Sequence, residues 1–197
     1  MKMNEVIQEM RKYAEEYNIP IMTDDGMRYL LNYIQRHHVK KVLEVGTAIG
    51  YSAICMCSVD PELTVTTIER DEKRYLEALK NIKKAGLEDR IEILYQDALE
   101  VQLEDTYDLL FIDAAKAQNQ KFFERFEGNL SSEGSVITDN MSFHGMVGLD
   151  PEKIESRNVR QLARKVNDYK EFLIHNIRYH TEFFDIGDGL AVSEKIS

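Results

Sequence analysis

The chain of 197 residues has few cysteines, no long apolar run and fewer basic than acidic residues. It has two cysteines, Cys55 and Cys57, which lie two positions apart in an apolar stretch. On a helix such residues point in different directions and cannot pair, so we expect free buried thiols rather than a disulfide. No apolar run approaches the ~18 residues of a membrane span, and the polar N-terminal segment is unlike a signal peptide. We therefore expect a cytoplasmic protein without a membrane segment.

Positive charge is also scarce. The chain has 25 Lys and Arg against 35 Asp and Glu, a formal net charge of −10. This balance argues against nucleic-acid affinity through overall charge, but it does not exclude a local basic patch. Such a patch is found in the segment RNVRQLARK, where Arg157, Arg160 and Arg164 have the spacing of one helical face and Lys165 follows. On the residues alone, a solvated helix face is the alternative interpretation.

Internal repeats, low-complexity tracts and long linkers are absent, which predicts a single domain over residues 1–197. Helical spacing predicts two N-terminal helices within residues 1–38, separated by Pro20 and the cluster at 23–26. Further along, the patterns predict strands at 41–45, 63–68, 91–95, 109–112 and 135–138, and helices at 51–59, 71–85, 119–129 and 157–176. This alternation predicts an α/β fold, with a mostly parallel sheet covered by helices on both faces.

The end of the chain breaks the alternation. After a polar segment, 142–155, which contains His144 as a weak candidate for substrate contact, comes the long helix at 157–176. Residues 181–196 then read as two strands joined at Gly187-Asp188-Gly189. Such a turn is typical of a β-hairpin, so we expect the last strand to be antiparallel.

Two predicted strands end in oxygen-bearing side chains. YDLLFIDAAK places Asp113 at the end of one strand, and GSVITDN places Asp139 and Asn140 at the end of the next. Ligands bind outside the carboxyl ends of strands in an open parallel sheet. Two carboxylates and an amide oxygen suit a hard cation such as Mg²⁺. Capping of the following turn is the alternative for either strand end alone.

The loop after the first predicted strand indicates a nucleoside ligand. Gly46 opens this loop, but Ala48 replaces the middle glycine that a pyrophosphate would need. Glu44 precedes the loop and can attract a cationic ligand. Glu69, at the end of the second strand, can accept hydrogen bonds from ribose hydroxyls, and Asp97 after the third strand can meet an adenine edge. For Glu69 alone, a favourable interaction with a helix N-terminus is the alternative.

These motifs together resemble a known family. EVGTAIGYS (44–52), TIE (67–69), QDA (96–98), FIDAAK (111–116), ITDN (137–140) and IGDGLAVS (186–193) are similar to segments of the class I S-adenosylmethionine-dependent methyltransferases. More narrowly, they resemble the cation-dependent O-methyltransferases that include catechol and caffeoyl-CoA O-methyltransferases. The resemblance implies a Rossmann-like seven-stranded sheet in the order 3-2-1-4-5-7-6, with S-adenosylmethionine and Mg²⁺ or another divalent cation as cofactors. A nonenzymatic nucleotide-binding module is the alternative from a different class.

The resemblance also implies roles for particular residues. It assigns Asp113, Asp139 and Asn140 to the metal, and Lys116 to the catalytic site with Asp113, either as general base or in positioning the substrate. A surface charge is the alternative for Lys116. The residues implied to bind the cofactor are Met22, Glu44, Gly46, Thr47, Ser52, Glu69, Asp97, Ala98 and Asp113.

The segment MVGLDPEKIESRNVRQLARKVNDY resembles bacterial enzymes that methylate 5-hydroxyuridine at the tRNA wobble position to 5-methoxyuridine. This makes tRNA the expected substrate, with Arg157, Arg160, Arg164 and Lys165 as its contact surface. A small catechol, another phenol or an acyl-CoA ester is the alternative acceptor. Because relatives are commonly homodimers, we expect a homodimer, in which the apolar N-terminal helices could form the contact.

Overall fold

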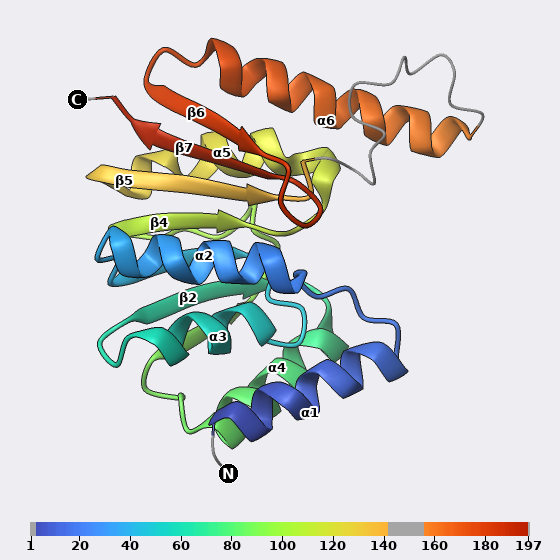
Figure 1. Cartoon of the computed structure of the whole chain (residues 1–197), viewed down its shortest axis with the longest axis vertical. Coiled ribbons are helices and arrows are strands. Elements are labelled where there is room, and N and C mark those ends of the chain that lie inside the picture. The colour runs from blue at the N-terminus through green and yellow to red at the C-terminus, as the bar shows by residue number, and fades with distance from the viewer. Residues whose placement is uncertain (1–2, 142–155, 197) are drawn as a thin grey trace.

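The computed structural model describes residues 3–141 and 156–196, which form a seven-stranded sheet with helices packed around it (Figure 1). The strands are β1 (Lys41–Val45), β2 (Thr64–Glu69), β3 (Ile91–Tyr95), β4 (Tyr107–Ile112), β5 (Leu130–Asp139), β6 (Tyr179–Phe184) and β7 (Leu190–Lys195). Their order is β3-β2-β1-β4-β5-β7-β6, and β7 runs antiparallel to both of its neighbours. The predicted strand order and the predicted antiparallel last strand are confirmed.

Helices cover both faces of this sheet. They are α1 (Met3–Glu16), α2 (Asp24–Arg36), α3 (Tyr51–Val59), α4 (Glu72–Ala85), α5 (Asn119–Phe126) and α6 (Arg157–His175), with 3₁₀ turns η1 (Lys116–Gln118) and η2 (Glu127–Asn129). Side chains alternate along β4 because a strand points successive residues to opposite faces. Leu109 and Phe111 pack with residues of α1, α2 and α3, whereas Leu110 and Ile112 pack with α5 and α6.

Three predicted boundaries differ from the structure by three residues or more. The cluster at 23–26 is the start of α2 rather than a break before it, because Thr23 caps the helix by accepting a hydrogen bond from the Gly26 amide at 3.3 Å. Strand β5 begins at Leu130 instead of 135, and α5 ends at Phe126 before a 3₁₀ turn. Polar residues in the first half of β5 conceal this part of the strand in the sequence pattern.

The apolar face of helix α1 packs against other helices of the same chain. Val6, Met10 and Ala14 are buried, and α1 packs on α3 and α4. These three side chains of α1 are therefore covered by the chain itself. The expected homodimer stays a prediction, with no surface assigned to it.

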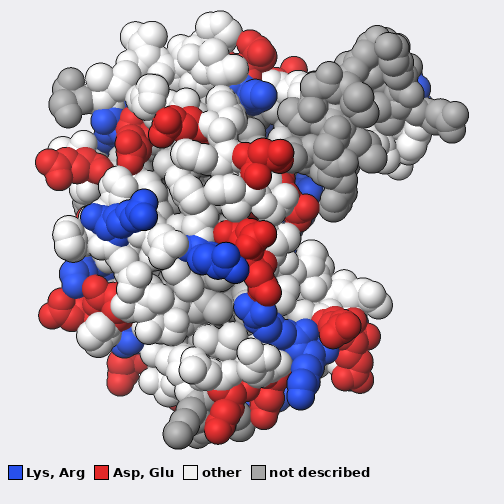
Figure 2. All heavy atoms as spheres, in the orientation of Figure 1, with Lys and Arg blue, Asp and Glu red and all other residues white. Residues whose placement is uncertain are grey.

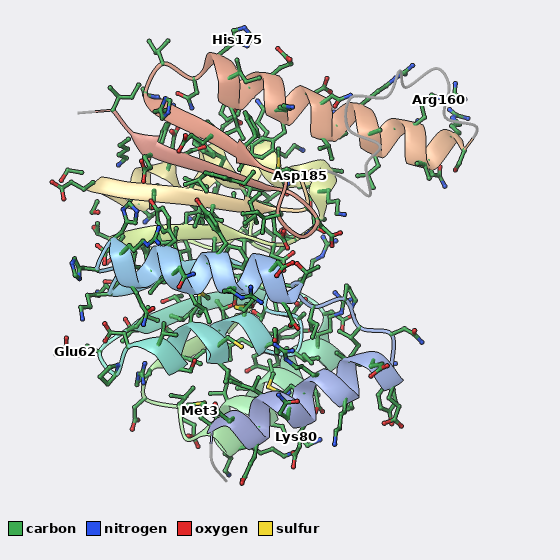
Figure 3. The ribbon with its side chains drawn as sticks, viewed as in Figure 1. Met3, Glu62, Lys80, Arg160, His175 and Asp185 are labelled. Carbon is green, nitrogen blue, oxygen red and sulfur yellow. The ribbon has the colours of Figure 1, made fainter. Side chains whose placement is uncertain are left out.

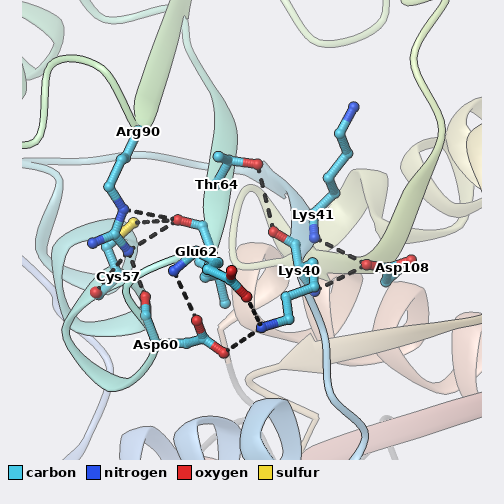
Figure 4. Close-up of polar contacts among 9 residues, drawn as sticks. Lys40, Lys41, Cys57, Asp60, Glu62, Thr64, Arg90 and Asp108 are labelled. Atoms are coloured by element: carbon cyan, nitrogen blue, oxygen red, sulfur yellow. Dashed lines mark hydrogen bonds and ion pairs between the residues drawn. The ribbon is translucent and has the colours of Figure 1, made fainter.

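The amino ends of the strands are held together by side-chain contacts with the backbone (Figure 4). Asp108 Oδ2 accepts hydrogen bonds from the amides of Lys40 and Lys41, at 2.9 and 3.0 Å. The Arg90 guanidinium donates to the carbonyls of Cys57, Asp60 and Leu63. These contacts join β1 to β4, and β3 to the loop before β2, at the edge opposite the predicted site.

In residues 3–141 and 156–196, no helix is long and apolar enough to cross a membrane. Both cysteines are free and buried, as predicted. His144 and the rest of the polar segment at 142–155 lie outside the residues that the structure describes.

Candidate active site

A cavity of about 490 Å³ lies at the carboxyl ends of the parallel strands, where the sequence predicted the site. In Figure 1 this edge of the sheet is on the right, where the arrows of β4 and β5 end. Its walls come from the ends of β1, β2, β4 and β5, from the loop between α1 and α2, and from η1. Of the residues predicted for the cofactor and the metal, those on the cavity wall are Met22, Gly46, Glu69, Asp97, Ala98, Asp113, Asp139 and Asn140.

The loop after β1 passes very close to the end of β4. Gly46 has φ +102°, and a Cβ added there would lie 2.1 Å from the carbonyl oxygen of Asp113. A glycine is therefore required both by the backbone angle and by the close approach. Asn81 of α4 holds the far side of the loop, where its Nδ2 donates to the Ile49 carbonyl at 3.0 Å. The end of the loop is Gly50, which packs against Ala78 of α4.

Glu69 is fixed by backbone donors at the end of β2. Its Oε2 accepts from the Ala48 amide at 2.9 Å, and its Oε1 accepts from the Asp71 amide at 2.8 Å. Each carboxylate oxygen retains a second acceptor position, so Glu69 can still receive hydroxyl donors from a ligand in the cavity. This geometry leaves room for the ribose contact, which stays a prediction.

Three residues predicted for the cofactor form a buried cluster behind the loop and do not line the cavity. Glu44 is 0% exposed and accepts hydrogen bonds from the hydroxyls of Ser52 and Thr67. Thr47 Oγ1 lies 2.6 Å from Thr67 Oγ1. Burial raises the pKa of Glu44 to about 7, although its two hydroxyl donors act in the opposite direction. The structure thus places Glu44, Thr47 and Ser52 where they support the loop from within the core.

The predicted metal ligands come together. Asn140 Nδ2 donates to Asp113 Oδ1 at 3.0 Å, and the Asn140 amide donates to Asp139 Oδ1 at 2.8 Å. Burial raises the pKa values of both Asp113 and Asp139. The negative charge of Glu44 adds to the increase for Asp113, and that of Asp113 adds to it for Asp139. Two adjacent carboxylates, one buried and one half-buried, that destabilise each other's charged form are suited to a divalent cation.

The donor set fits such a cation with one adjustment. Asn140 has φ +68°, an angle that is uncommon for a residue with a side chain, and this turn brings it beside Asp113. Its nitrogen faces Asp113 here, and a half-turn of the amide presents its oxygen instead. Within residues 3–141 and 156–196, no group of three or more His, Cys, Asp or Glu is arranged to hold a metal ion. The third protein oxygen would therefore be the amide oxygen of Asn140.

Lys116 lies in η1 on the cavity wall, and its positive charge lowers the pKa values of Asp113 and Asp139. Helix α6 packs on η1. The hydroxyl of Tyr169 in this helix lies 2.8 Å from Thr138 Oγ1, next to Asp139. Helix α6 therefore contacts both the turn that carries Lys116 and the end of the strand that carries Asp139.

The predicted basic residues lie outside the cavity, near the beginning of α6. Arg157, Arg164 and Lys165 are exposed, and Arg160 is half-buried. Figure 3 shows Arg160 and Asp185 toward the same edge of the sheet, opposite Glu62. On the face shown in Figure 2, acidic and basic side chains are interspersed. The structure thus brings the basic residues to the edge of the sheet that carries the cavity.

Sequence reasoning missed Arg70, Arg74 and Asp188, all of which line the cavity. Asp188 lies in the predicted hairpin turn, and its negative charge adds to the increases in the pKa values of Asp113 and Asp139. The predicted hairpin turn could have identified Asp188. Because β7 was expected beside β5, the turn before β7 was expected near Asp139. Arg70 directly follows Glu69, and this adjacency could have identified it.

Comparisons with known proteins identify the family of this chain. A family model described as O-methyltransferase matches residues 1–196. A caffeoyl-CoA O-methyltransferase from Populus kitakamiensis is 25% identical over 194 residues, covering 94% of this chain and 82% of the relative. A crystal structure described as a putative caffeoyl-CoA O-methyltransferase from Staphylococcus aureus is 42% identical, with a TM-score of 0.91 over 96% of this chain and 92% of that one. The fold is shared with an O-methyltransferase from Bacillus cereus in complex with SAH, at 23% identity and a TM-score of 0.81 over 98% and 91% of the two chains. This chain therefore belongs to the O-methyltransferase family, and it is an S-adenosylmethionine-dependent O-methyltransferase.

Proposed function

We propose that this enzyme methylates a hydroxyl group that is held by a divalent cation at Asp113, Asp139 and Asn140. The observation that supports this proposal is the pair of aspartates on the cavity wall, Asp139 buried and Asp113 half-buried, whose pKa values are raised by desolvation. A bound cation lowers the pKa of an acceptor hydroxyl and thereby makes its oxygen a better nucleophile. Glu69 and the loop at Gly46 would align the methyl donor against this oxygen.

Lys116 is suited to take the proton of the acceptor hydroxyl or to position that hydroxyl. It shares the cavity wall with Asp113 and Asp139, and its charge acts on both. A lysine acts as a base only when its ammonium loses a proton easily, and a neighbouring cation favours that loss. Replacing Lys116 by Met should therefore lower kcat more than it changes the affinity for the methyl donor.

Asp139→Asn tests the role of the cation. We expect this variant to bind S-adenosylhomocysteine with nearly the wild-type Kd in calorimetry while its methyl transfer falls at least 100-fold. Asp185→Asn is the matched control, because Asp185 is an exposed carboxylate toward the same edge (Figure 3). Full activity of Asp139→Asn, or of the wild type in excess chelator, would contradict the proposal.

The acceptor that we favour is 5-hydroxyuridine at the wobble position of tRNA. The support is the position of α6, whose first turns carry Arg157, Arg160 and Arg164 and extend toward the cavity edge of the sheet (Figure 3). Basic side chains there can hold tRNA phosphates while a single extruded base enters the cavity. The net charge of −10 makes such a local surface necessary for any affinity for tRNA.

Charge reversal separates this acceptor from others. Replacing Arg157, Arg160 and Arg164 by Glu should weaken tRNA methylation at least tenfold and leave methylation of a small catechol unchanged. The control replaces three exposed lysines outside α6, Lys41 of β1 and Lys80 and Lys83 of α4, by Glu and gives the same change in net charge. Equal tRNA methylation by the two triple variants would rule out docking through α6.

A small phenol or an acyl-CoA ester is the second candidate acceptor. Its support is the set of names carried by relatives, caffeoyl-CoA O-methyltransferase and, for a protein 25% identical, flavonoid 3′,5′-methyltransferase. A single assay with labelled methyl donor, undermodified tRNA and a panel of catechols distinguishes the two classes. Labelled catechol without labelled tRNA would favour this second candidate.

A cytoplasmic homodimer is the proposed form of the enzyme. The sequence resemblance alone supports the homodimer, and the two free cysteines fit a reducing compartment. Light scattering on the purified protein should give about twice the mass of the chain. A single-chain mass at micromolar concentration would contradict it.

A further inference from the structure

The turn between β6 and β7, at 185–189, contacts two different parts of the cavity wall. Its backbone is closed by a hydrogen bond from the Gly189 amide to the Ile186 carbonyl at 2.9 Å. The Gly189 carbonyl also accepts from the amide of Met141 at 2.9 Å, directly after Asn140. The turn is therefore fixed to the end of β5, where the proposed metal ligands lie.

The second contact of this turn is with the beginning of α2. Gly187 has φ +58°, and a Cβ added there would lie 2.1 Å from Thr23 Oγ1 and 3.5 Å from the amide nitrogen of Gly26. This close approach requires a glycine, because any side chain would overlap the Thr23 hydroxyl. Thr23 does not yield easily, since the same hydroxyl caps α2 by accepting from the Gly26 amide and β-branching restricts its rotation.

The residues beside this second contact line the cavity. Met22 precedes Thr23 and is 5% exposed, and its Cε would lie 3.1 Å from a Cβ added at Gly26. Asp188 follows Gly187 on the cavity wall, and its negative charge adds to the raised pKa values of the two proposed carboxylate ligands. The turn thus connects the wall at Met22, predicted to contact the methyl donor, with the wall that carries the proposed metal ligands.

We infer that the turn at 185–189 sets the distance between these two walls, and that Gly187 and Thr23 are positioning residues because their contact holds the turn against α2. The inference rests on the proposed placement of the methyl donor and the cation in this cavity. Methyl transfer depends on the alignment of the acceptor oxygen with the methyl group, so the separation of the two walls matters for the reaction.

Gly187→Ala tests the contact by calorimetry, with S-adenosylhomocysteine and Mg²⁺ each titrated into the whole enzyme. The added methyl group either moves the turn away from α2 or displaces Thr23 from its cap, so both Kd values should rise about threefold to tenfold. The value of kcat should fall roughly 10–100-fold, because a displacement of about 1 Å between reacting groups is enough for such a loss.

Gly86→Ala is the matched control for backbone strain. Gly86 also has a positive φ, +66°, but a Cβ added there meets nothing within 4 Å. This variant should leave both Kd values and kcat unchanged. A Gly187→Ala variant that melts at a lower temperature but keeps both Kd values and kcat would show that the contact only stabilises the fold, and would overturn the inference.

Thr23→Gly in the Gly187→Ala background is the rescue experiment. It removes the overlapping hydroxyl, and glycine is still acceptable as an N-cap. The double variant should therefore return both Kd values and kcat to within about twofold of Thr23→Gly alone. Additive losses would refute the contact, and a change in one Kd without the other would refute the connection between the two walls.

Thr23→Ser and Thr23→Val test the same contact from α2, should Gly187→Ala fail to fold. Serine keeps the capping oxygen and should bind both ligands as the wild type does. Valine puts a methyl group in place of that oxygen next to Gly187, and it should raise both Kd values. Equal binding by the two variants would overturn the inference.

Asp139→Asn separates a failure of this inference from a failure of the proposed site. If Asp139→Asn binds Mg²⁺ as the wild type does, the cation does not lie at Asp139 and both statements fail. If Asp139→Asn loses Mg²⁺ while Gly187→Ala keeps both ligands, the site holds and the role of the turn is refuted.

Discussion

Replacing Gly46 by alanine should disrupt the cofactor loop and the metal end of the cavity together. Gly46 has φ +102°, and the added Cβ would lie 2.1 Å from the carbonyl oxygen of Asp113, 2.8 Å from its carbonyl carbon and 3.1 Å from the Cα of Ala114. All three atoms belong to the backbone, so no side-chain rotation can relieve the contact. The ends of β1 and β4 must move apart for the methyl group to fit.

The expected cost has two parts. A residue with a side chain at this backbone angle is strained by about 2 kcal/mol. Forcing a methyl group into the closely packed contact adds about 2 kcal/mol more. For a chain of this size, each 1 kcal/mol lowers Tm by about 2–4 °C, so Gly46→Ala should melt roughly 8–16 °C below the wild type.

Gly86→Ala is the matched control. Gly86 also has a positive φ, +66°, but a Cβ added there meets nothing within 4 Å. Its cost is therefore conformational alone, about 1 kcal/mol, or roughly 2–4 °C in Tm. Differential scanning calorimetry of both variants, with titration of S-adenosylhomocysteine, measures the difference. The reasoning is refuted if Gly46→Ala melts within 2 °C of Gly86→Ala and binds the ligand equally well.

Three other substitutions test contacts behind and beside the site. Burial raises the pKa of Glu44 to about 7, so the folded state gains least from Glu44 above this pH. Urea denaturation of the wild type without ligands, compared with Glu44→Gln, should show a loss of roughly 2–3 kcal/mol in unfolding free energy between pH 4.5 and 8. A difference between the two proteins that does not change with pH would contradict the raised pKa. Tyr169→Phe leaves the buried Thr138 hydroxyl without its partner and should lower Tm by roughly 3–6 °C; an unchanged Tm would show that the hydrogen bond contributes nothing. Arg90→Met removes the donors to three carbonyls and should cost about 2–3 kcal/mol in urea denaturation without changing the Kd for S-adenosylhomocysteine; a weaker Kd would show that the two edges of the sheet are coupled.

The alternation of strands and helices and the location of the cavity could be predicted because both depend on features that the sequence displays directly, whereas the strand order came from the family resemblance. Buried strands such as β4 appear as apolar runs, and their carboxyl ends are marked by residues such as Asp113 and Asp139. Parallel strands place these ends at one edge of the sheet. The resemblance supplied the position of β7 between β5 and β6.

Side-chain direction at the end of a strand could not be predicted in the same way. Glu44 and Glu69 both stand at strand ends beside the loop, yet one is enclosed by Ser52 and Thr67 and the other lines the cavity. The difference depends on which face of the sheet each residue occupies and on which hydroxyls pack against it. The ion pair between Arg70 and Asp97 was missed for a similar reason, because it joins residues 27 positions apart whose proximity follows only from the pairing of β2 with β3.

The two edges of the sheet have different roles, since one is stabilised by side-chain contacts with the backbone and the other forms the cavity. The contacts of Asp108 and Arg90 with the backbone lie at the amino ends of the strands, whereas the cavity lies at the carboxyl ends. Mutations that tune thermal tolerance can therefore accumulate at one edge while acceptor preference diverges at the other. For directed evolution, this separation recommends stabilising the amino-end contacts first and then randomising the cavity wall in that more tolerant background.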